Sequence, residues 1–186
     1  MQNSITIAVD AMGGDNSPQK IINGINLALQ ENNNIKFNIF GDINLINPLV
    51  KNNLLVKDKS QIIHAETNIE DHESPLSAAK KGDKSSMWKA INSVKEKKSD
   101  VILSAGNTGA LLILSKMILE MISGIDKPAL AGLWPNKNGM NIVLDLGANI
   151  ECGEKNLIDF SFMGAALYKS LFTDVDAKIA ILNVGS

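Results

Sequence analysis

The stretch SAGNTGALLIL, residues 104–114, places small and polar residues directly before an apolar helical pattern. A helix leaves its first backbone N–H groups without intrahelical partners, and these groups favour an anion together with the helix dipole. Gly106 and Gly109 would let a ligand approach the backbone closely, and Asn107 and Thr108 offer side-chain donors. The sequence therefore predicts an anion-binding turn. Close packing of the helix against a strand is the alternative use of the glycines.

A second helix start, in GDKSSM, offers another arrangement that suits a phosphate group. Lys84 stands beside Ser85 and Ser86, so one ammonium and two hydroxyls would surround the N-terminus of the following helix. Such charge-assisted contacts at a helix start hold a phosphate well. The alternative is ordinary N-capping by a serine beside a solvated lysine.

Two further turns follow strand-like runs and carry acidic side chains. In VDAMGGD, Gly13 and Gly14 permit positive φ angles, and Asp15 would orient a substrate or an active-site lysine. In LDLGAN, Asp145 and Asn149 would orient a lysine, a serine or a water molecule. A tight turn with local capping explains the first motif equally well, and a structural Asx turn explains the second.

The other reactive side chains form no recognisable catalytic or metal-binding pattern. His64 and His72 lie outside any Ser-His-Asp or metal-ligand spacing. Cys152 is the single cysteine, which excludes an intramolecular disulfide and a thiolate-rich metal site. The glycines also lack the spacing of the dinucleotide fingerprint and of the Walker loop. We therefore expect a site of backbone amides and polar side chains, with no metal and no cofactor.

The composition is that of an ordinary globular protein of about one domain. Of the 186 residues, 45% are hydrophobic, 4% aromatic and 20% charged, and the formal net charge is -2. That charge gives no general attraction for nucleic acid or an anionic membrane. The N-terminus lacks the pattern of a signal peptide, and the apolar run 110–122 is too short and too charged to span a bilayer. These features favour a cytoplasmic protein.

Strand-like runs alternate with helical patterns along the chain. This alternation predicts an α/β fold with a mainly parallel sheet and helices on both faces. Ser17 is the expected N-cap of the first helix, with Pro18 in its first turn. The predicted strands are residues 5–10, 35–42, 60–66, 100–105, 128–135, 141–147 and 177–186, of which the fifth and sixth would pair across NKNG. The predicted helices are residues 18–29, 45–51, 76–81, 85–98, 107–121 and 156–172.

The turns that close these runs match a known family. The motifs IAVDAMGGDNSP, SSMWKAI, SAGNTGAL, GIDKPAL, LDLGAN and ILNVGS occur in the order and approximate spacing of PlsX-type phosphate acyltransferases. The chain resembles that family over essentially its whole length. The resemblance implies a fold similar to isopropylmalate dehydrogenases and phosphotransacetylases. Family members continue for roughly as long again, so it also implies that residues 1–186 are a single α/β domain, the N-terminal half of a longer, here truncated, fold.

The resemblance implies an enzyme of phospholipid biosynthesis. Such enzymes transfer a long acyl chain from acyl carrier protein to inorganic phosphate, and a membrane glycerol-3-phosphate acyltransferase then uses the acyl phosphate. It further implies a cytoplasmic homodimer that is peripheral at the membrane in its full-length form. The alternatives are a truncated non-catalytic remnant and a short-chain phosphate acetyl- or butyryltransferase that uses coenzyme A.

This chemistry needs a positioned phosphate and a stabilised oxyanion, because phosphate is already an anionic nucleophile. Such a site requires Asn107, Ser86 and Asp145 to line one cavity. The expected catalytic residues are Asn107, Asp145 and Asn149. The expected substrate-binding residues are Gly13, Gly14, Asp15, Lys84, Ser85, Ser86, Gly106, Thr108 and Gly109.

Overall fold

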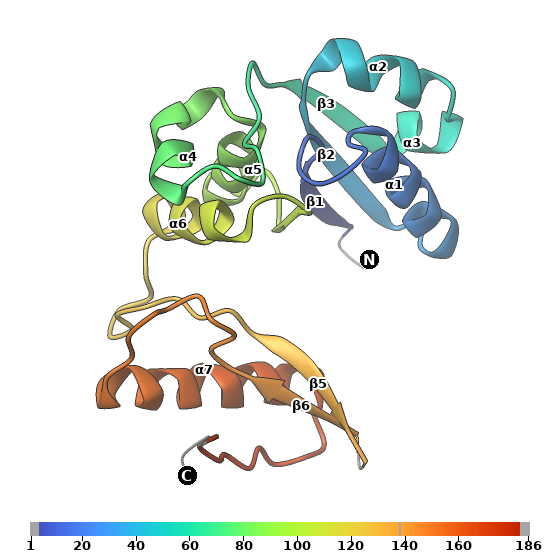
Figure 1. Ribbon diagram of the computed structural model, residues 1–186. Coiled ribbons are helices and arrows are strands. Elements are labelled where there is room, and N and C mark those ends of the chain that lie inside the picture. Colours follow the sequence, from blue (N-terminus) through green and yellow to red (C-terminus); the bar gives the residue numbers. More distant parts are fainter. Residues whose placement is uncertain (1–3, 138, 183–186) are drawn as a thin grey trace. The chain divides into compact units, whose positions relative to one another are not determined.

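The computed structural model describes residues 4–137 and 139–182 (Figure 1). The chain forms two compact units, Met1–Glu120 and Met121–Ser186, and each is described by itself. A single domain that includes both units, and the likeness to isopropylmalate dehydrogenases, stay predictions.

The first unit is built on a four-stranded parallel sheet with the strand order β3-β2-β1-β4. Its elements follow the chain as β1 (Ile5–Asp10), α1 (Gln19–Glu31), β2 (Ile35–Gly41), α2 (Ile43–Lys51), α3 (Leu54–Lys59), β3 (Ser60–His64), α4 (Pro75–Lys81), the 3₁₀ turn η1 (Gly82–Lys84), α5 (Ser86–Lys95), β4 (Val101–Ser104) and α6 (Thr108–Leu119). The predicted α/β fold with a mainly parallel sheet is confirmed. The short helix α3 is an addition to the predicted elements.

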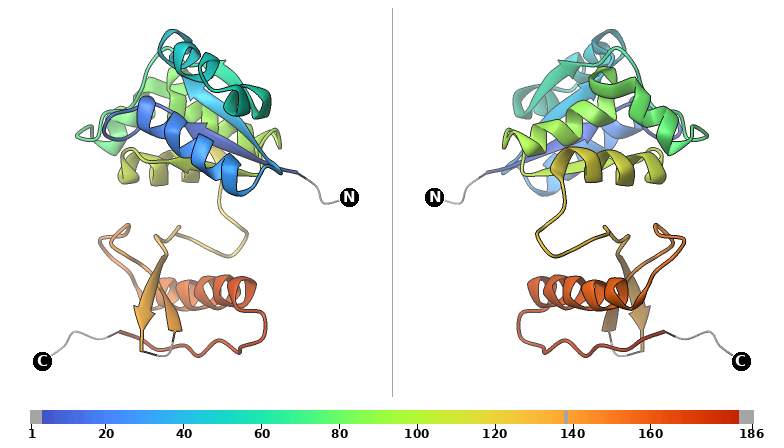
Figure 2. Two further views of the ribbon diagram at one scale, coloured as in Figure 1. Left: turned by 90° about the vertical axis from the view of Figure 1, so that its right-hand side faces the viewer. Right: turned by 90° about the vertical axis from the view of Figure 1, so that its left-hand side faces the viewer.

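Helices cover both faces of this sheet. Successive strand residues point to opposite faces, so each face carries apolar side chains that a helix must cover. On one face, Val9 and Ile39 pack against α1, α2 and α3. On the other face, Ala8 and Phe40 pack against Ala90 of α5. A second apolar layer joins α5 to α4 and α6, and Figure 2 shows the helices on the two sides of the sheet.

The start of α1 differs from the prediction. The helix begins at Gln19, and no side chain caps its first turn. The hydroxyl of Ser17 donates to the carbonyl oxygen of Gly13 instead, at 2.6 Å. The predicted Ser17 cap is therefore wrong, because a helix that begins at Gln19 has Pro18 at its N-cap position, and proline has no side-chain oxygen to accept an N–H.

The second unit contains a hairpin and one long helix. Its elements are β5 (Gly132–Asn136), β6 (Gly139–Val143) and α7 (Glu154–Leu171), and α7 lies against β6. The two strands pair antiparallel, which confirms the predicted pairing across residues 136–139. In the ranges that the structure describes, no helix combines the length and the apolar character needed to cross a membrane.

The predicted final strand is wrong for residues 177–182, which form no strand. Ile179, Ile181 and Leu182 are 58%, 75% and 83% exposed. A strand needs a neighbour for its backbone N–H and C=O groups, and no described strand pairs with this segment. The rest of that prediction, residues 183–186, lies outside the described residues.

Candidate functional site

The turns that follow β1 and β4 pack directly against each other at the carboxyl edge of the sheet. A Cβ atom added to Gly13 would lie 2.8 Å from the backbone nitrogen of Gly106. Gly14 has a φ of +82°, and an added Cβ would lie 2.7 Å from the carbonyl oxygen of Ala105. Only glycine fits such contacts. The structure thus shows that Gly13 and Gly14 allow the two turns to pack closely, and their contact with substrate stays a prediction.

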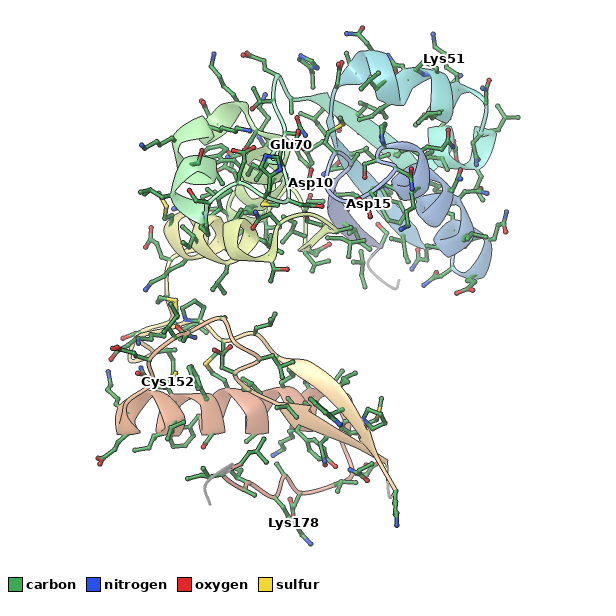
Figure 3. The ribbon with its side chains drawn as sticks, viewed as in Figure 1. Asp10, Asp15, Lys51, Glu70, Cys152 and Lys178 are labelled. Atoms are coloured by element: carbon green, nitrogen blue, oxygen red, sulfur yellow. The ribbon has the colours of Figure 1, made fainter. Side chains whose placement is uncertain are left out.

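Asp10, the last residue of β1, is a carboxylate enclosed between these turns. Its side chain accepts hydrogen bonds from Ser86 (Oγ to Oδ1, 2.7 Å) and Ser104 (Oγ to Oδ2, 2.8 Å). The N–H of Met12 donates to Oδ1 at 3.3 Å. Asp10 is 2% exposed, so this carboxylate joins β1, β4 and the start of α5 inside the first unit (Figure 3).

Sequence reasoning missed Asp10. Its hydroxyl partners Ser86 and Ser104 lie 76 and 94 residues further along the chain, so no local spacing indicates them. One signal was present in the sequence, namely an aspartate at the end of the apolar run ITIAVD. A carboxylate that is buried at such a place needs hydrogen-bond donors.

Burial raises the pKa of Asp10, and the hydrogen bonds from Ser86, Ser104 and the Met12 N–H lower it by less. The pKa therefore lies above its ordinary value. When Asp10 is ionised it can only accept, so Ser86 and Ser104 both direct their protons toward it. In that state the hydroxyl of Ser86 is not available as a donor to a phosphate oxygen.

The two serines at the start of α5 lie below the surface. Ser85 and Ser86 are both 0% exposed. Ser85 is the N-cap, because its hydroxyl oxygen accepts the N–H of Trp88 at 3.2 Å. Lys84 points outward and forms an ion pair with Glu66 at 3.2 Å. The capping alternative thus describes Ser85, and a phosphate contact of this group stays a prediction.

Asn107 caps α6 and holds a neighbouring loop at the same time. Its Oδ1 accepts the N–H of Ala110 at 2.9 Å. Its Nδ2 donates to the carbonyl oxygens of Glu70, Asp71 and Glu73 at 3.3, 2.9 and 2.9 Å. Both polar ends of this side chain are therefore engaged within the first unit, and its catalytic role stays a prediction.

Lys81, in α4, also binds the loop of residues 68–73. Its ammonium donates to the carbonyl oxygen of Asn68 at 2.7 Å and pairs with the carboxylate of Glu73. Glu73 also accepts the N–H of Glu70 at 2.8 Å. The N–H of Glu70 and then Lys81 hold the pKa of Glu73 below its ordinary value. The segment 68–73 is thus tied to both α4 and α6.

A polar pocket of about 320 Å³ lies between this loop and the turn after β1. It brings Gly14 and Asp15 together with Glu70 and Asp71 (Figure 3). The lining carries three carboxylates and no basic side chain, so a phosphate dianion is disfavoured inside it. Within residues 4–137 and 139–182, no group of three or more His, Cys, Asp or Glu is placed to bind a metal ion.

A larger groove of about 870 Å³ runs alongside α5 over β2 and β3. Its lining includes Trp88 and Lys89 but none of the predicted site residues. The groove therefore does not bear on the chemistry at the carboxyl edge of the sheet.

Four predicted residues remain, namely Thr108 and Gly109 at the start of α6 in the first unit, and Asp145 and Asn149 in the second. Thr108 is exposed. A Cβ on Gly109 would lie 3.0 Å from Pro75 Cγ, which is a close helix–helix contact. Asp145 accepts the N–H of Leu130 at 2.7 Å and the N–H and side-chain amide of Asn149 at 2.8 and 3.1 Å. This matches the structural-turn alternative.

The charge of Asp145 is stabilised by the turn that it organises. Burial raises its pKa, but the hydrogen bonds from Leu130, Asn149 and the N–H of Ala148 outweigh it and hold the pKa below the ordinary value. Because Asp145 belongs to the second unit and Asn107 to the first, one cavity shared by them stays a prediction.

Comparison with known proteins identifies the family. The model of the family described as "Fatty acid synthesis protein" matches residues 5–186. The chain belongs to this family. The phosphate acyltransferase of Pelagibacter ubique is 58% identical over all of this chain and 55% of its own length. Those of Beijerinckia indica and Paramagnetospirillum magneticum are 42% and 38% identical over the whole chain, and 48% and 53% of their own lengths.

These matches confirm the resemblance to PlsX-type phosphate acyltransferases. The chain spans about half the length of the curated relatives it matches.

Replacing Asp10 by asparagine tests the buried charge. Because its pKa is raised in the folded state, Asp10 stabilises the fold most below its unfolded pKa and loses that contribution as the pH rises through the folded pKa. Relative to Asp10→Asn, the wild type should therefore lose stability from about pH 4 upward, by at most about tenfold in the folding constant per pH unit. Urea unfolding of both proteins from pH 4 to 8 measures this difference. A difference that is flat or rises with pH would contradict the assignment.

Gly13→Ala tests the contact between the two turns, with Gly24→Ala as its matched control. The added methyl would meet the backbone of Gly106 and the carboxylate of Asp10 at 2.8–2.9 Å, and we expect a loss of about 1–3 kcal/mol in unfolding free energy. Gly24 lies inside α1 with nothing within 4 Å, so alanine there should stabilise by about 0.5–1 kcal/mol. Thermal and urea unfolding check both values, and equal effects at the two positions would contradict the packing.

Proposed function

We propose that this family member is an acyl-ACP:phosphate acyltransferase that makes acyl phosphate for phospholipid biosynthesis. The observation that carries the proposal is the 58% identity to a phosphate acyltransferase over every residue of the chain. Acyl carrier protein would be the donor and inorganic phosphate the acceptor. The proposal extends to a cytoplasmic homodimer, peripheral at the membrane, whose product passes to a membrane glycerol-3-phosphate acyltransferase.

The reaction is one acyl transfer without a covalent enzyme intermediate. A phosphate oxygen attacks the thioester carbonyl carbon, the new C–O bond forms, and the carbonyl oxygen becomes an oxyanion. The C–S bond then breaks, and the leaving thiolate takes a proton. The enzyme contributes most by holding a phosphate oxygen close to the thioester carbonyl carbon and by placing N–H donors around the oxyanion.

The start of α6 is the part of the first unit best suited to bind phosphate. Thr108, the first residue of this 12-residue helix, is exposed, and Asn107 already caps Ala110. The backbone N–H groups of Thr108 and Gly109 have no intrahelical acceptor, because they lie in the first turn. The helix dipole adds roughly 0.3–1 kcal/mol for an anion at this end. Lys84 would add a substrate-binding side chain in the same unit. The catalytic roles of Asp145 and Asn149 stay predictions.

Acyl phosphate formation tests the proposal directly. We expect the protein, given inorganic phosphate and palmitoyl-ACP, to form palmitoyl phosphate that hydroxylamine traps as the hydroxamate, and to form none when phosphate is omitted. Turnover only with acetyl-CoA or butyryl-CoA would replace the proposal by a short-chain enzyme. Absence of turnover with every donor by the folded protein would favour a non-catalytic remnant.

Thr108→Pro tests the backbone donor itself, with Thr108→Ala as the matched control. Proline removes one N–H at the first helical position, where its ring is tolerated, and the extended ψ of 110° at Asn107 suits a following proline. If this N–H contacts the phosphate or the oxyanion, Thr108→Pro should lower kcat/KM by about 10²–10³-fold. Thr108→Ala keeps the N–H and should lose much less. Equal losses in the two variants, with circular dichroism showing intact helices, would remove this donor from the site.

A further inference from the structure

We infer that Asp10 is the positioning residue of this site, because it sets the place of the turn 105–107 from which α6 starts. It acts through Ser104 on the backbone of Gly106 and through Ser86 on the start of α5. The inference rests on the proposed function, since the turn that Asp10 holds is the one proposed to bind phosphate.

A continuous hydrogen-bonded connection runs from Asp10 to the turn. Ser104 donates its proton to Asp10 at 2.8 Å, and its oxygen accepts the N–H of Gly106 at 3.2 Å. A hydroxyl that donates to one fixed group and accepts from another cannot rotate freely. The carboxylate thereby fixes the direction of the Gly106 N–H, two residues before the Thr108 N–H that is proposed to bind phosphate.

Both turns are packed onto this carboxylate, so its position is transmitted to them. A Cβ on Gly13 would lie 2.9 Å from Asp10 Oδ2 and 2.9 Å from the Cα of Gly106. Gly13, Gly106 and the Asp10 carboxylate are therefore closely packed, and we expect a shift of the carboxylate to shift both turns. A displacement of about 1 Å near reacting groups is enough to lower a rate about 10²-fold.

The two oxygens of Asp10 have different surroundings, which makes a conservative variant informative. Oδ1 accepts from Ser86 and from the N–H of Met12, so it must stay an acceptor. Oδ2 accepts from Ser104, whose hydroxyl can also accept. Asparagine can therefore keep its oxygen toward Met12 and donate its amide to Ser104. Alanine loses every one of these contacts.

The chain offers a matched control at the opposite end of the same strands. The Oδ2 of Asp100 accepts the N–H of Thr6 at 2.7 Å, so this carboxylate also joins β4 to β1. It lies before β4, whereas Asp10 ends β1 and pairs in register with Ser104 at the far end. Asp100→Ala should weaken the sheet without moving the two turns.

The experiment compares Asp10→Ala, Asp10→Asn, Ser104→Ala and Asp100→Ala in the whole chain. Hydrogen exchange is followed at residues 12–14 and 105–110, and kcat and KM for phosphate are measured with palmitoyl-ACP. We expect Asp10→Ala and Ser104→Ala to speed exchange at both turns and to raise the KM for phosphate about 10–100-fold. Asp10→Asn should recover most of that loss. Asp100→Ala should lower the unfolding free energy and leave the KM and the exchange at both turns near the wild-type values.

Unchanged exchange at the turns in Ser104→Ala and Asp10→Ala, or equal changes in Asp100→Ala, would overturn the inference. Should Asp10→Ala fail to fold, Ser104→Ala and Asp10→Asn carry the comparison. If the wild type forms no acyl phosphate, the proposed function fails. The exchange data then decide by themselves whether Asp10 holds the turns.

Discussion

The carboxyl edge of the first unit depends on one buried carboxylate and the donors that surround it. Removing a carboxylate from water is unfavourable unless hydrogen bonds replace the lost hydration. Asp10 meets part of this requirement with two hydroxyls and one backbone N–H, which come from α5, β4 and the turn after β1, and its pKa stays raised because burial outweighs them. These donors hold α5, β4 and the turn after β1 together. At the same point, the close contact of Gly13 with Gly106 leaves no room for a larger side chain at Gly13.

The polar side chains near this edge are used mainly to build it. Asn107 both starts α6 and carries the loop 70–73, and Lys81 holds the same loop from α4. Ser85 caps α5, and Ser86 is turned toward Asp10. With these side chains engaged, the proposed phosphate site would use backbone N–H groups, which the fold holds in place before an anion binds.

The local charges support this division of labour. The pocket beside the turn after β1 contains carboxylates, and the nearby ammonium groups of Lys81 and Lys84 are paired with Glu73 and Glu66. These pairings offset part of the positive charge that Lys81 and Lys84 bring to this edge. Phosphate binding at the start of α6 would depend on peptide dipoles and on close approach to the turn rather than on net charge, which suits a chain whose formal net charge is -2.

By itself the sequence determined the elements whose signals are local. Apolar runs bounded by turn residues predicted β1 over Ile5–Asp10 and the pairing of β5 with β6, because period and turn chemistry act over a few residues. Motif order also indicated the family. The tertiary structure alone decided which polar atoms meet, since the partners of Asp10 lie 76 and 94 residues away and those of Asn107 lie 34 to 37 residues away. It also overruled the strand predicted over residues 177–182, because an apolar pattern supplies side chains for a sheet but not the neighbouring backbone that a strand must pair with.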